Sequence, residues 1–362
     1  MSKTILVGMS GGVDSSVCAL LLKKQGYNVI GARMTIWGDR QMQETVDKMK
    51  TSNACFSPNE KERIEEAKKI ASELGIEFYS VDCTKEYEKI VLDNFRQEYL
   101  KGRTPNPCVM CNPLVKFKAL PELAKKMGIE FDYFATGHYA KIEKRGERFV
   151  IKRGIMLKKD QSYFLYKLSQ EQLSKILLPL GNYTKEEIRT LAREFGLEVA
   201  NKPDSQDFYD GDYNDLLKIE EKIGNIVDTS GKILGQHKGI WNYTVGQRKG
   251  LKISSTKPLY VISLNKEKNE VVVGNIDETF NKALYATDIN FVGIEDITEP
   301  IKVRAKFRST QQPTEATLEK IDDDTIKVTF DEYQKSIAMG QSVVCYDEDD
   351  VILVGGIIDK VE

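Results

Sequence analysis

The chain has 362 residues, a length that predicts two or three domains. Of these residues 41% are hydrophobic and 30% are charged, a composition typical of soluble globular proteins. Its 53 basic and 55 acidic side chains leave a formal charge of −2, which excludes a global field that attracts nucleic acid, so such binding needs local patches. No apolar run reaches the roughly 18–20 residues of a membrane span, and the first strand starts almost at Met1. We therefore expect no membrane or targeting segment and a cytoplasmic, reducing location.

A glycine-rich turn joins the first expected strand, residues 4–7, to the first expected helix, residues 16–24. The turn consists of Gly8, Met9, Ser10, Gly11, Gly12, Val13, Asp14 and Ser15. A strand–turn–helix unit aims backbone N–H groups and the positive helix end at an anion, and glycines let a phosphate come close. Asp14 either caps the helix or holds Mg²⁺. Neither the Walker nor the dinucleotide glycine pattern is present.

The first third of the chain alternates between strand and helix. Apolar runs predict further strands at 28–33, 77–82 and 131–136, and periodic segments predict helices at 60–74 and 114–127. This order indicates a doubly wound α/β fold with a parallel sheet. The polar segment 38–58 follows the second strand, at the sheet edge where active sites form.

Residues 104–112 contain two prolines and two asparagines, which predict a constrained loop and not a helix. The segment carries Cys108 and Cys111, at a spacing that lets two sulfurs bind one metal ion or each other.

The sequence pattern changes twice in the rest of the chain. Helices are expected at 161–168, 170–177 and 185–195, glycine-punctuated segments follow residue 210, and short strands at 302–308, 314–318, 325–330 and 351–358 predict a small antiparallel β-barrel. We expect a catalytic domain at 1–208 with a helical part at about 141–200, a connecting domain at 209–282 and the barrel at 283–362.

Two basic patches suit a phosphate backbone. Residues 141–159 carry a net charge of +6. In the strand 302–308 four cations alternate with apolar residues, which places them on one face; they are Lys302, Arg304, Lys306 and Arg308, with Val303, Ala305 and Phe307 facing the core.

The turn Ser-Gly-Gly-Val-Asp-Ser at 10–15 resembles the PP-loop of ATP pyrophosphatases, which cleave ATP between its α- and β-phosphates. Together with the segments 104–112, 136–140, 159–165, 202–207, 243–251 and 340–346, it makes nearly the whole chain resemble the tRNA-specific 2-thiouridylases. The resemblance implies that O2 of the wobble uridine, position 34, is adenylated and that sulfur then displaces AMP. It also implies ATP, Mg²⁺, the tRNAs for lysine, glutamate and glutamine, and a sulfur donor that is a protein relay or inorganic sulfide.

The resemblance further implies roles for individual residues. ATP would lie on residues 8–15, Met34 and Gly137, Cys111 and Cys108 would be catalytic, and Asn106, Pro107 and Cys108 would touch the target base. The implied tRNA contacts are His138, Asp160, Gln161, Phe307, Arg308 and Gln341, and the two basic patches add Lys159 and Arg304.

Two positions depart from the family pattern. Cys108 stands where the family has an aspartate, and Tyr209 stands where the family has its second catalytic cysteine. A phenol cannot carry a persulfide, so the usual relay between two cysteines cannot operate here. Three hypotheses remain open. They are a 4Fe–4S cluster on Cys55, Cys108 and Cys111 with Cys83 in reserve, as in iron–sulfur-dependent tRNA thiolases; a persulfide shared by Cys108 and Cys111; and a structural zinc on all four cysteines.

Two other functions compete with thiolation. One is a PP-loop ligase that forms an amide or amidine on a small metabolite, which requires neither the cysteine pair nor a basic strand. The other is a catalytically silent tRNA-binding paralogue, which Tyr209 suggests and the intact turn at 8–15 opposes.

Overall fold

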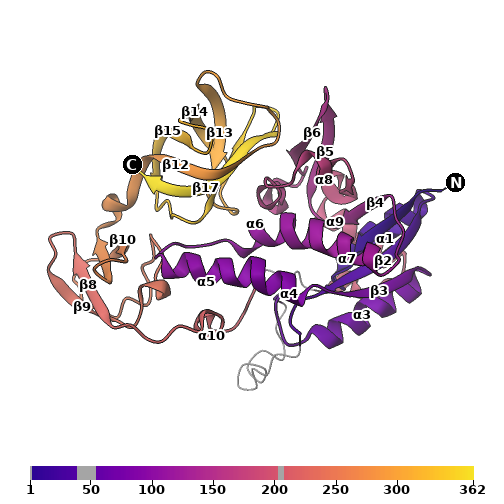
Figure 1. Ribbon diagram of the computed structural model, residues 1–362, viewed down its shortest axis with the longest axis horizontal. Helices are drawn as coiled ribbons and strands as arrows, with labels where there is room; N and C mark the ends of the chain where they lie inside the picture. The colour runs from indigo at the N-terminus through magenta and orange to yellow at the C-terminus, as the bar shows by residue number, and fades with distance from the viewer. Residues whose placement is uncertain (1, 39–53, 203–207) are drawn as a thin grey trace. The chain divides into compact units, whose positions relative to one another are not determined.

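The computed structural model describes residues 2–38, 54–202 and 208–362 (Figure 1). They form two compact units. The first contains residues 1–92, 107–216 and 350–352, and the second contains 93–106, 217–349 and 353–362. The expected three-part division at residues 208 and 282 stays a prediction.

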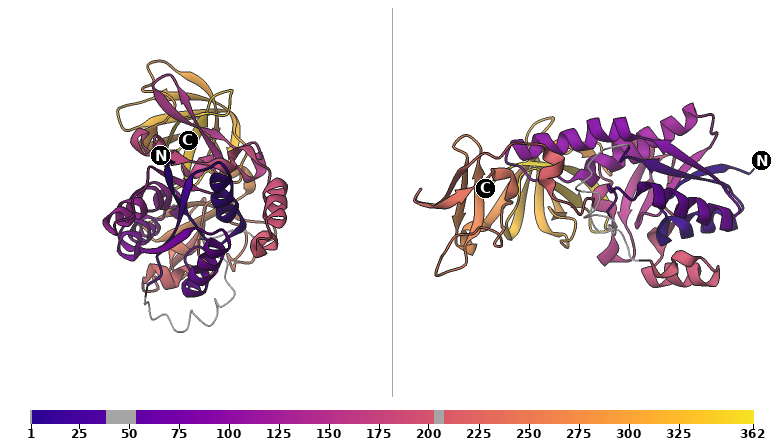
Figure 2. Two further views of the ribbon diagram at one scale, coloured as in Figure 1. Left: turned by 90° about the vertical axis from the view of Figure 1, so that its right-hand side faces the viewer. Right: turned by 90° about the horizontal axis from the view of Figure 1, so that it is seen from below.

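The first unit is built on a five-stranded parallel sheet of order β3-β2-β1-β4-β7. Its strands are β1 (Thr4–Gly8), β2 (Asn28–Thr35), β3 (Glu77–Asp82), β4 (Tyr133–Thr136) and β7 (Ile176–Leu177). Helices cover both faces of the sheet (Figure 2), which confirms the predicted doubly wound α/β fold. All four strands expected from the sequence are present, and β7 is an addition at the edge.

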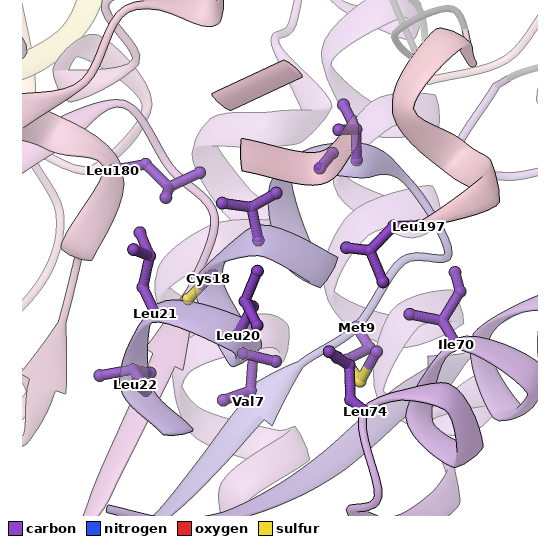
Figure 3. Close-up of a cluster of buried hydrophobic side chains, with 14 of the residues drawn as sticks. Val7, Met9, Cys18, Leu20, Leu21, Leu22, Ile70, Leu74, Leu180 and Leu197 are labelled. Carbon is purple, nitrogen blue, oxygen red and sulfur yellow. The ribbon is translucent and has the colours of Figure 1, made fainter. Parts of the chain in front are cut away.

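One face of this sheet buries the apolar side of three helices. These are α1 (Val13–Lys24), α3 (Glu60–Glu73) and α9 (Lys185–Glu194). Val7 and Met9 pack there with Cys18 of α1, and Ile70 and Leu197 close the cluster, as Figure 3 shows. Cys18 is completely buried, as its place in an apolar helix predicts.

The remaining helices of the first unit are short. They are α4 (Thr84–Tyr87), α6 (Pro107–Cys111), α7 (Leu120–Lys126), α8 (Gln170–Leu173) and α10 (Tyr213–Leu217), with π-helical segments at Glu88–Leu92 and Asn112–Ala119. Two expectations were wrong. The helix predicted over 161–168 is only a 3₁₀ turn, Ser162–Phe164, and the helix predicted over 170–177 ends at Leu173 because residues 176–177 join the sheet as β7. Sheet pairing overrides helical propensity there.

The basic segment 141–159 contains a hairpin of β5 (Ala140–Arg145) and β6 (Arg148–Arg153) and the 3₁₀ turn Leu157–Lys159. It therefore forms no part of a helical region.

The second unit begins with α5 (Asp93–Leu100) and contains two β structures. A four-stranded sheet has the order β10-β11-β8-β9, with β8 (Gly224–Asp228), β9 (Ile233–His237), β10 (Tyr260–Asn265) and β11 (Glu270–Gly274). A closed barrel has the order β12-β15-β14-β13-β16-β17, with β12 (Phe280–Phe291), β13 (Ile301–Lys306), β14 (Thr314–Lys320), β15 (Ile326–Lys335), β16 (Ser342–Tyr346) and β17 (Ile352–Val361). The barrel confirms the predicted C-terminal fold.

The alternation in β13 produces the expected inner face, because Val303, Ala305 and Phe307 all lie in the barrel core. The outer face differs from expectation, because the Lys306 side chain is buried and β13 ends at this residue; the strand presents two cations, Lys302 and Arg304, and Arg308 follows it.

None of the helices among the described residues combines the length and the apolar character needed to cross a bilayer.

Candidate functional site

The turn at residues 8–15 begins where β1 ends and finishes in the first turn of α1. Gly11 has φ +78°, a conformation that side-chain-bearing residues rarely adopt, and Gly12 is the N-cap residue of α1 without any side-chain cap. Ser15 Oγ accepts from Ser10 N at 3.1 Å and donates to Gly12 O at 3.2 Å. These bonds hold the turn in shape, and the N-terminus of α1 carries no side-chain cap.

Asp14 neither caps the helix nor stands open to a metal ion. Its Oδ1 accepts a hydrogen bond from the Tyr139 hydroxyl at 2.6 Å, and the Lys185 ammonium lies 2.7 Å and 2.9 Å from its two oxygens. Sequence reasoning did not single out Lys185. The available signal was a lysine at the first residue of a helix, where a positive charge opposes the helix dipole.

Gly137 follows β4 and lies against the same turn. A Cβ atom at this position would stand 2.8 Å from Asp14 C and 2.9 Å from Ser15 N, so no side chain fits. Met34, near the end of β2, is half-buried. The structure thus brings the two outlying residues expected to contact the nucleotide, Met34 and Gly137, to the strand ends that flank β1.

The cysteine pair lies on a helix, which corrects the predicted loop. Pro107 opens α6, where the absent N–H is harmless, and the helix carries both cysteines. Both sulfur-bearing residues are partly exposed. Burial among protein atoms raises the pKa of the Cys111 thiol to about 11, although the Lys116 ammonium acts in the opposite direction.

Cys55 and Cys83 occupy different environments. Cys83 is buried at the start of α4, and burial raises its pKa to about 12, whereas Cys55 is exposed. The neighbours of Cys55 are anchored: Arg63 Nη1 donates to Ala54 O at 2.6 Å, and Phe56 N donates to Phe208 O at 2.8 Å. The pKa of Cys111 responds to the charges of Lys116 and Cys55, which therefore lie within electrostatic range of it.

Tyr209 is buried in an aromatic cluster. Its ring centroid lies 6.1 Å from that of Phe56, which in turn lies 5.4 Å from Tyr87 and 4.6 Å from Trp37. The segment that carries Cys55 is therefore packed beside the position where the family pattern has its second cysteine. Most of the segment 38–58, and residues 203–207 of the matched motif, lie outside the described residues.

Three expected tRNA contacts of the first unit are engaged inside the protein. His138 is buried, its Nδ1 lies 2.7 Å from Thr136 Oγ1, and burial holds its pKa well below the ordinary range. The fully buried Asp160 carboxylate accepts from Arg153 Nε at 3.3 Å and from Ser162 Oγ at 2.9 Å. Gln161 Oε1 accepts from Tyr139 N at 2.9 Å. Lys159 alone of this group is exposed.

The expected tRNA contacts in the second unit have different structural roles. Arg304 Nη2 donates to Asp347 O at 2.9 Å and Arg308 Nη2 donates to Ser336 O, so both guanidinium groups brace loops at the barrel surface. The ring of Phe307 is buried against Phe330, which leaves only its backbone for a contact. Gln341 Nε2 donates to Thr104 O at 2.8 Å and so holds the segment before Asn106.

The candidate metal ligands among the described residues do not form a preformed metal site. Among the described residues no three side chains of His, Cys, Asp or Glu are arranged to bind one metal ion. The residues present therefore do not fit a 4Fe–4S cluster or a four-cysteine zinc site as they stand, and Asp14 is already paired with a lysine.

Comparisons with known proteins agree with this geometry. Three family models match in chain order: the tRNA methyl transferase HUP domain at 3–209, the tRNA methyl transferase PRC-barrel domain at 216–275 and the aminomethyltransferase beta-barrel domain at 281–358. The tRNA-specific 2-thiouridylase MnmA of Endomicrobium trichonymphae is 48% identical over 358 residues, which cover 98% of each chain. MnmA of Clostridioides difficile (strain 630) is 46% identical over 369 aligned positions, which cover 99% of each chain.

Solved structures are more distant. The U34-tRNA thiolase NcsA from Methanococcus maripaludis, solved with its 4Fe–4S cluster, shares 22% identity and a TM-score of 0.32, over 56% of this chain and 59% of that one. A likeness of that size supports no argument about a cluster in this protein.

Proposed function

The chain belongs to the family of tRNA-specific 2-thiouridylases, and from this premise we propose that it uses ATP to replace O2 of uridine 34 in tRNA by sulfur. The structural observation that supports the proposal is the intact turn at 8–15, with an uncapped helix N-terminus at the carboxyl end of β1. We further propose a cytoplasmic location and the tRNAs for lysine, glutamate and glutamine as substrates.

The first chemical step is adenylation. The triphosphate lies on the N–H groups of residues 8–15, O2 of the target uridine attacks the α-phosphorus, and pyrophosphate leaves. We propose that Mg²⁺ enters with the phosphates, because this ion is commonly bound by one or two carboxylates together with substrate phosphates and waters. Asn106, Pro107 and Cys108 are the proposed contacts of the flipped-out base, since an enzyme that modifies a base has to take it out of the stack.

The second step transfers sulfur, and Cys111 is common to both of our hypotheses for it. In the first, Cys55, Cys108 and Cys111 would hold a 4Fe–4S cluster, which would supply a hydrosulfide ligand. The described side chains of these cysteines are not arranged to bind one metal ion, so no step is derived through the cluster.

In the second hypothesis a persulfide donor transfers its outer sulfur to the Cys111 thiolate, and the donor leaves as a thiolate. The outer sulfur attacks C2 of the adenylated uridine, a C–S bond forms, and the bond from C2 to the AMP oxygen breaks. Cys108 then attacks the Cys111 sulfur, which forms a Cys108–Cys111 disulfide and leaves the transferred sulfur on the base. An external dithiol reduces the disulfide. The position of both cysteines in the short helix α6 supports this route.

Two measurements test the proposal. Release of pyrophosphate from ATP should rise when tRNA is added, and mass spectrometry of tRNA nucleosides should detect 2-thiouridine with the wild type but not with Cys111→Ser. Pyrophosphate release that is stimulated by a small metabolite and not by tRNA would indicate the competing ligase, and tRNA binding without pyrophosphate release would indicate the silent paralogue. Anaerobic purification with iron and labile-sulfide assays separates the routes, because active enzyme without iron eliminates the cluster.

A further inference from the structure

A carboxylate stands inside the proposed phosphate site. Asp14 is the second residue of α1, and its neighbours in the chain, Gly12 and Ser15, form the turn that would receive the triphosphate. Its side chain is 29% exposed, so solvent screens its charge only in part. An unopposed negative charge at this point would repel the phosphates that the helix end attracts.

The protein brings a cation to this carboxylate from a distant part of the sequence. Lys185 Nζ lies 2.7 Å from Asp14 Oδ1 and 2.9 Å from Oδ2, and the Tyr139 hydroxyl donates to Oδ1 at 2.6 Å. The Lys185 side chain is only 9% exposed. A buried ammonium on a carboxylate with a further hydroxyl donor is a satisfied ion pair, which keeps Asp14 compensated at neutral pH.

A lysine at this position does not stabilise its own helix. Lys185 is the first residue of α9, where the helix dipole disfavours a positive charge. The start of α9 is already satisfied by a capping box, in which the Thr184 and Glu187 side chains bond to each other's backbone N–H groups. A residue that breaks a local rule without a local gain is expected at a functional position.

We propose that Lys185 is a positioning residue of the nucleotide site, which makes the turn at 8–15 competent to bind triphosphate by neutralising Asp14. Tyr139 assists by fixing the orientation of the carboxylate. The proposal rests on the ATP-binding part of the proposed function. It adds two residues that lie outside the turn at 8–15, Lys185 and Tyr139.

Equilibrium dialysis with labelled ATP and labelled adenosine tests this role. Lys185→Met should weaken ATP binding by at least about tenfold, as expected when a buried charge pair loses one partner. Adenosine has no phosphates, so its affinity should stay within about twofold of the wild-type value. Lys69→Met is the matched control, because Lys69 also pairs with a carboxylate, Glu198, but on the exposed surface. It should bind both ligands normally.

The double variant Asp14→Asn/Lys185→Met separates compensation from other roles. Removing both charges should return ATP affinity to within about threefold of wild type, and Lys185→Arg should retain it. If the double variant binds ATP as weakly as Lys185→Met, or if Lys185→Met binds ATP normally, the inference is overturned. Wild-type enzyme that binds ATP but releases no pyrophosphate with tRNA would refute the proposed function and leave this inference standing.

Discussion

Gly137 shows at the residue scale how closely the backbone is packed around the turn at residues 8–15. A Cβ at this position would lie 2.8 Å from Asp14 C and 2.9 Å from Ser15 N, and both neighbours are backbone atoms that cannot rotate away. We expect Gly137→Ala to displace the turn and to weaken ATP binding by at least about tenfold, as misplaced contact groups do. Calorimetric titration with ATP measures this. Gly128→Ala is the control for backbone strain alone, because Gly128 has φ +83° but no atom lies within 4 Å of its Cβ; ATP binding lost equally in both variants would contradict the prediction.

Cys111 carries a prediction about pH at the same scale. Its pKa of about 11 means that the thiol is protonated at neutral pH, and the thiolate is the reactive form. Alkylation of Cys111 by iodoacetamide should therefore rise about tenfold for each pH unit between pH 7 and 10. Mass spectrometry of the Cys111 peptide follows the rate. Lys116→Gln removes a charge that lowers this pKa, so it should slow the reaction at pH 8; a rate that is level from pH 7 upwards would refute the assignment.

At the scale of elements, Asp160 joins β6 to the 3₁₀ turn that follows it. Its fully buried carboxylate accepts bonds from Arg153 Nε, Gly154 N and both donors of Ser162. Asp160→Ala should lower the free energy of unfolding by about 3 kcal/mol or more, because it leaves a buried guanidinium without this partner. Urea denaturation checks the value. Lys159→Ala, next in the chain but exposed, should change it by less than about 0.5 kcal/mol; equal effects would contradict an anchoring role for Asp160.

Sequence patterns predicted well the helices with one-sided apolar periodicity and the strands marked by apolar runs. The helices at 60–74 and 185–195 are of the first kind and the strands at 28–33 and 77–82 of the second, and the structure has all of them within a few residues. The segment 104–112 was misjudged because prolines usually end helices, yet Pro107 stands at the first position of α6, where proline is favoured. The segment 170–177 was misjudged because the pairing of β7 with β4 depends on a partner that is distant in sequence.

In the candidate site too, local features could be predicted from the sequence and long-range contacts could not. The turn at 8–15 and the cysteine pair are short contiguous motifs, so their chemistry can be inferred without a structure. The pairing of Asp14 with Lys185 and the bond from Phe56 N to Phe208 O join residues more than 150 positions apart. No local pattern contains such contacts. They explain why sequence reasoning listed Asp14 as a cap or a metal ligand, and why it did not connect Cys55, a candidate cluster ligand, with Tyr209.

At the scale of the whole molecule, a chain with a charge of −2 has to bind tRNA through local groups. Arg304 and Arg308 are the proposed groups on the barrel. Reversing both to Glu should weaken tRNA binding strongly at low salt and reduce the slope of log K against log salt by about one for each lost phosphate contact. Filter binding over a range of KCl concentrations gives both values, and ATP binding should persist.

The design has to separate lost charge from lost structure, because both guanidinium groups also donate to backbone carbonyls, Arg304 to Asp347 O and Arg308 to Ser336 O. Arg304→Gln/Arg308→Gln keeps an amide donor at each position, on a shorter side chain, and removes the positive charge, so it should flatten the salt dependence while thermal unfolding stays close to wild type. Lys238→Glu, an exposed charge reversal directly after β9, controls for the change in net charge. If the Gln pair and the wild type show the same salt slope, the two arginines serve the barrel alone and the tRNA surface lies elsewhere.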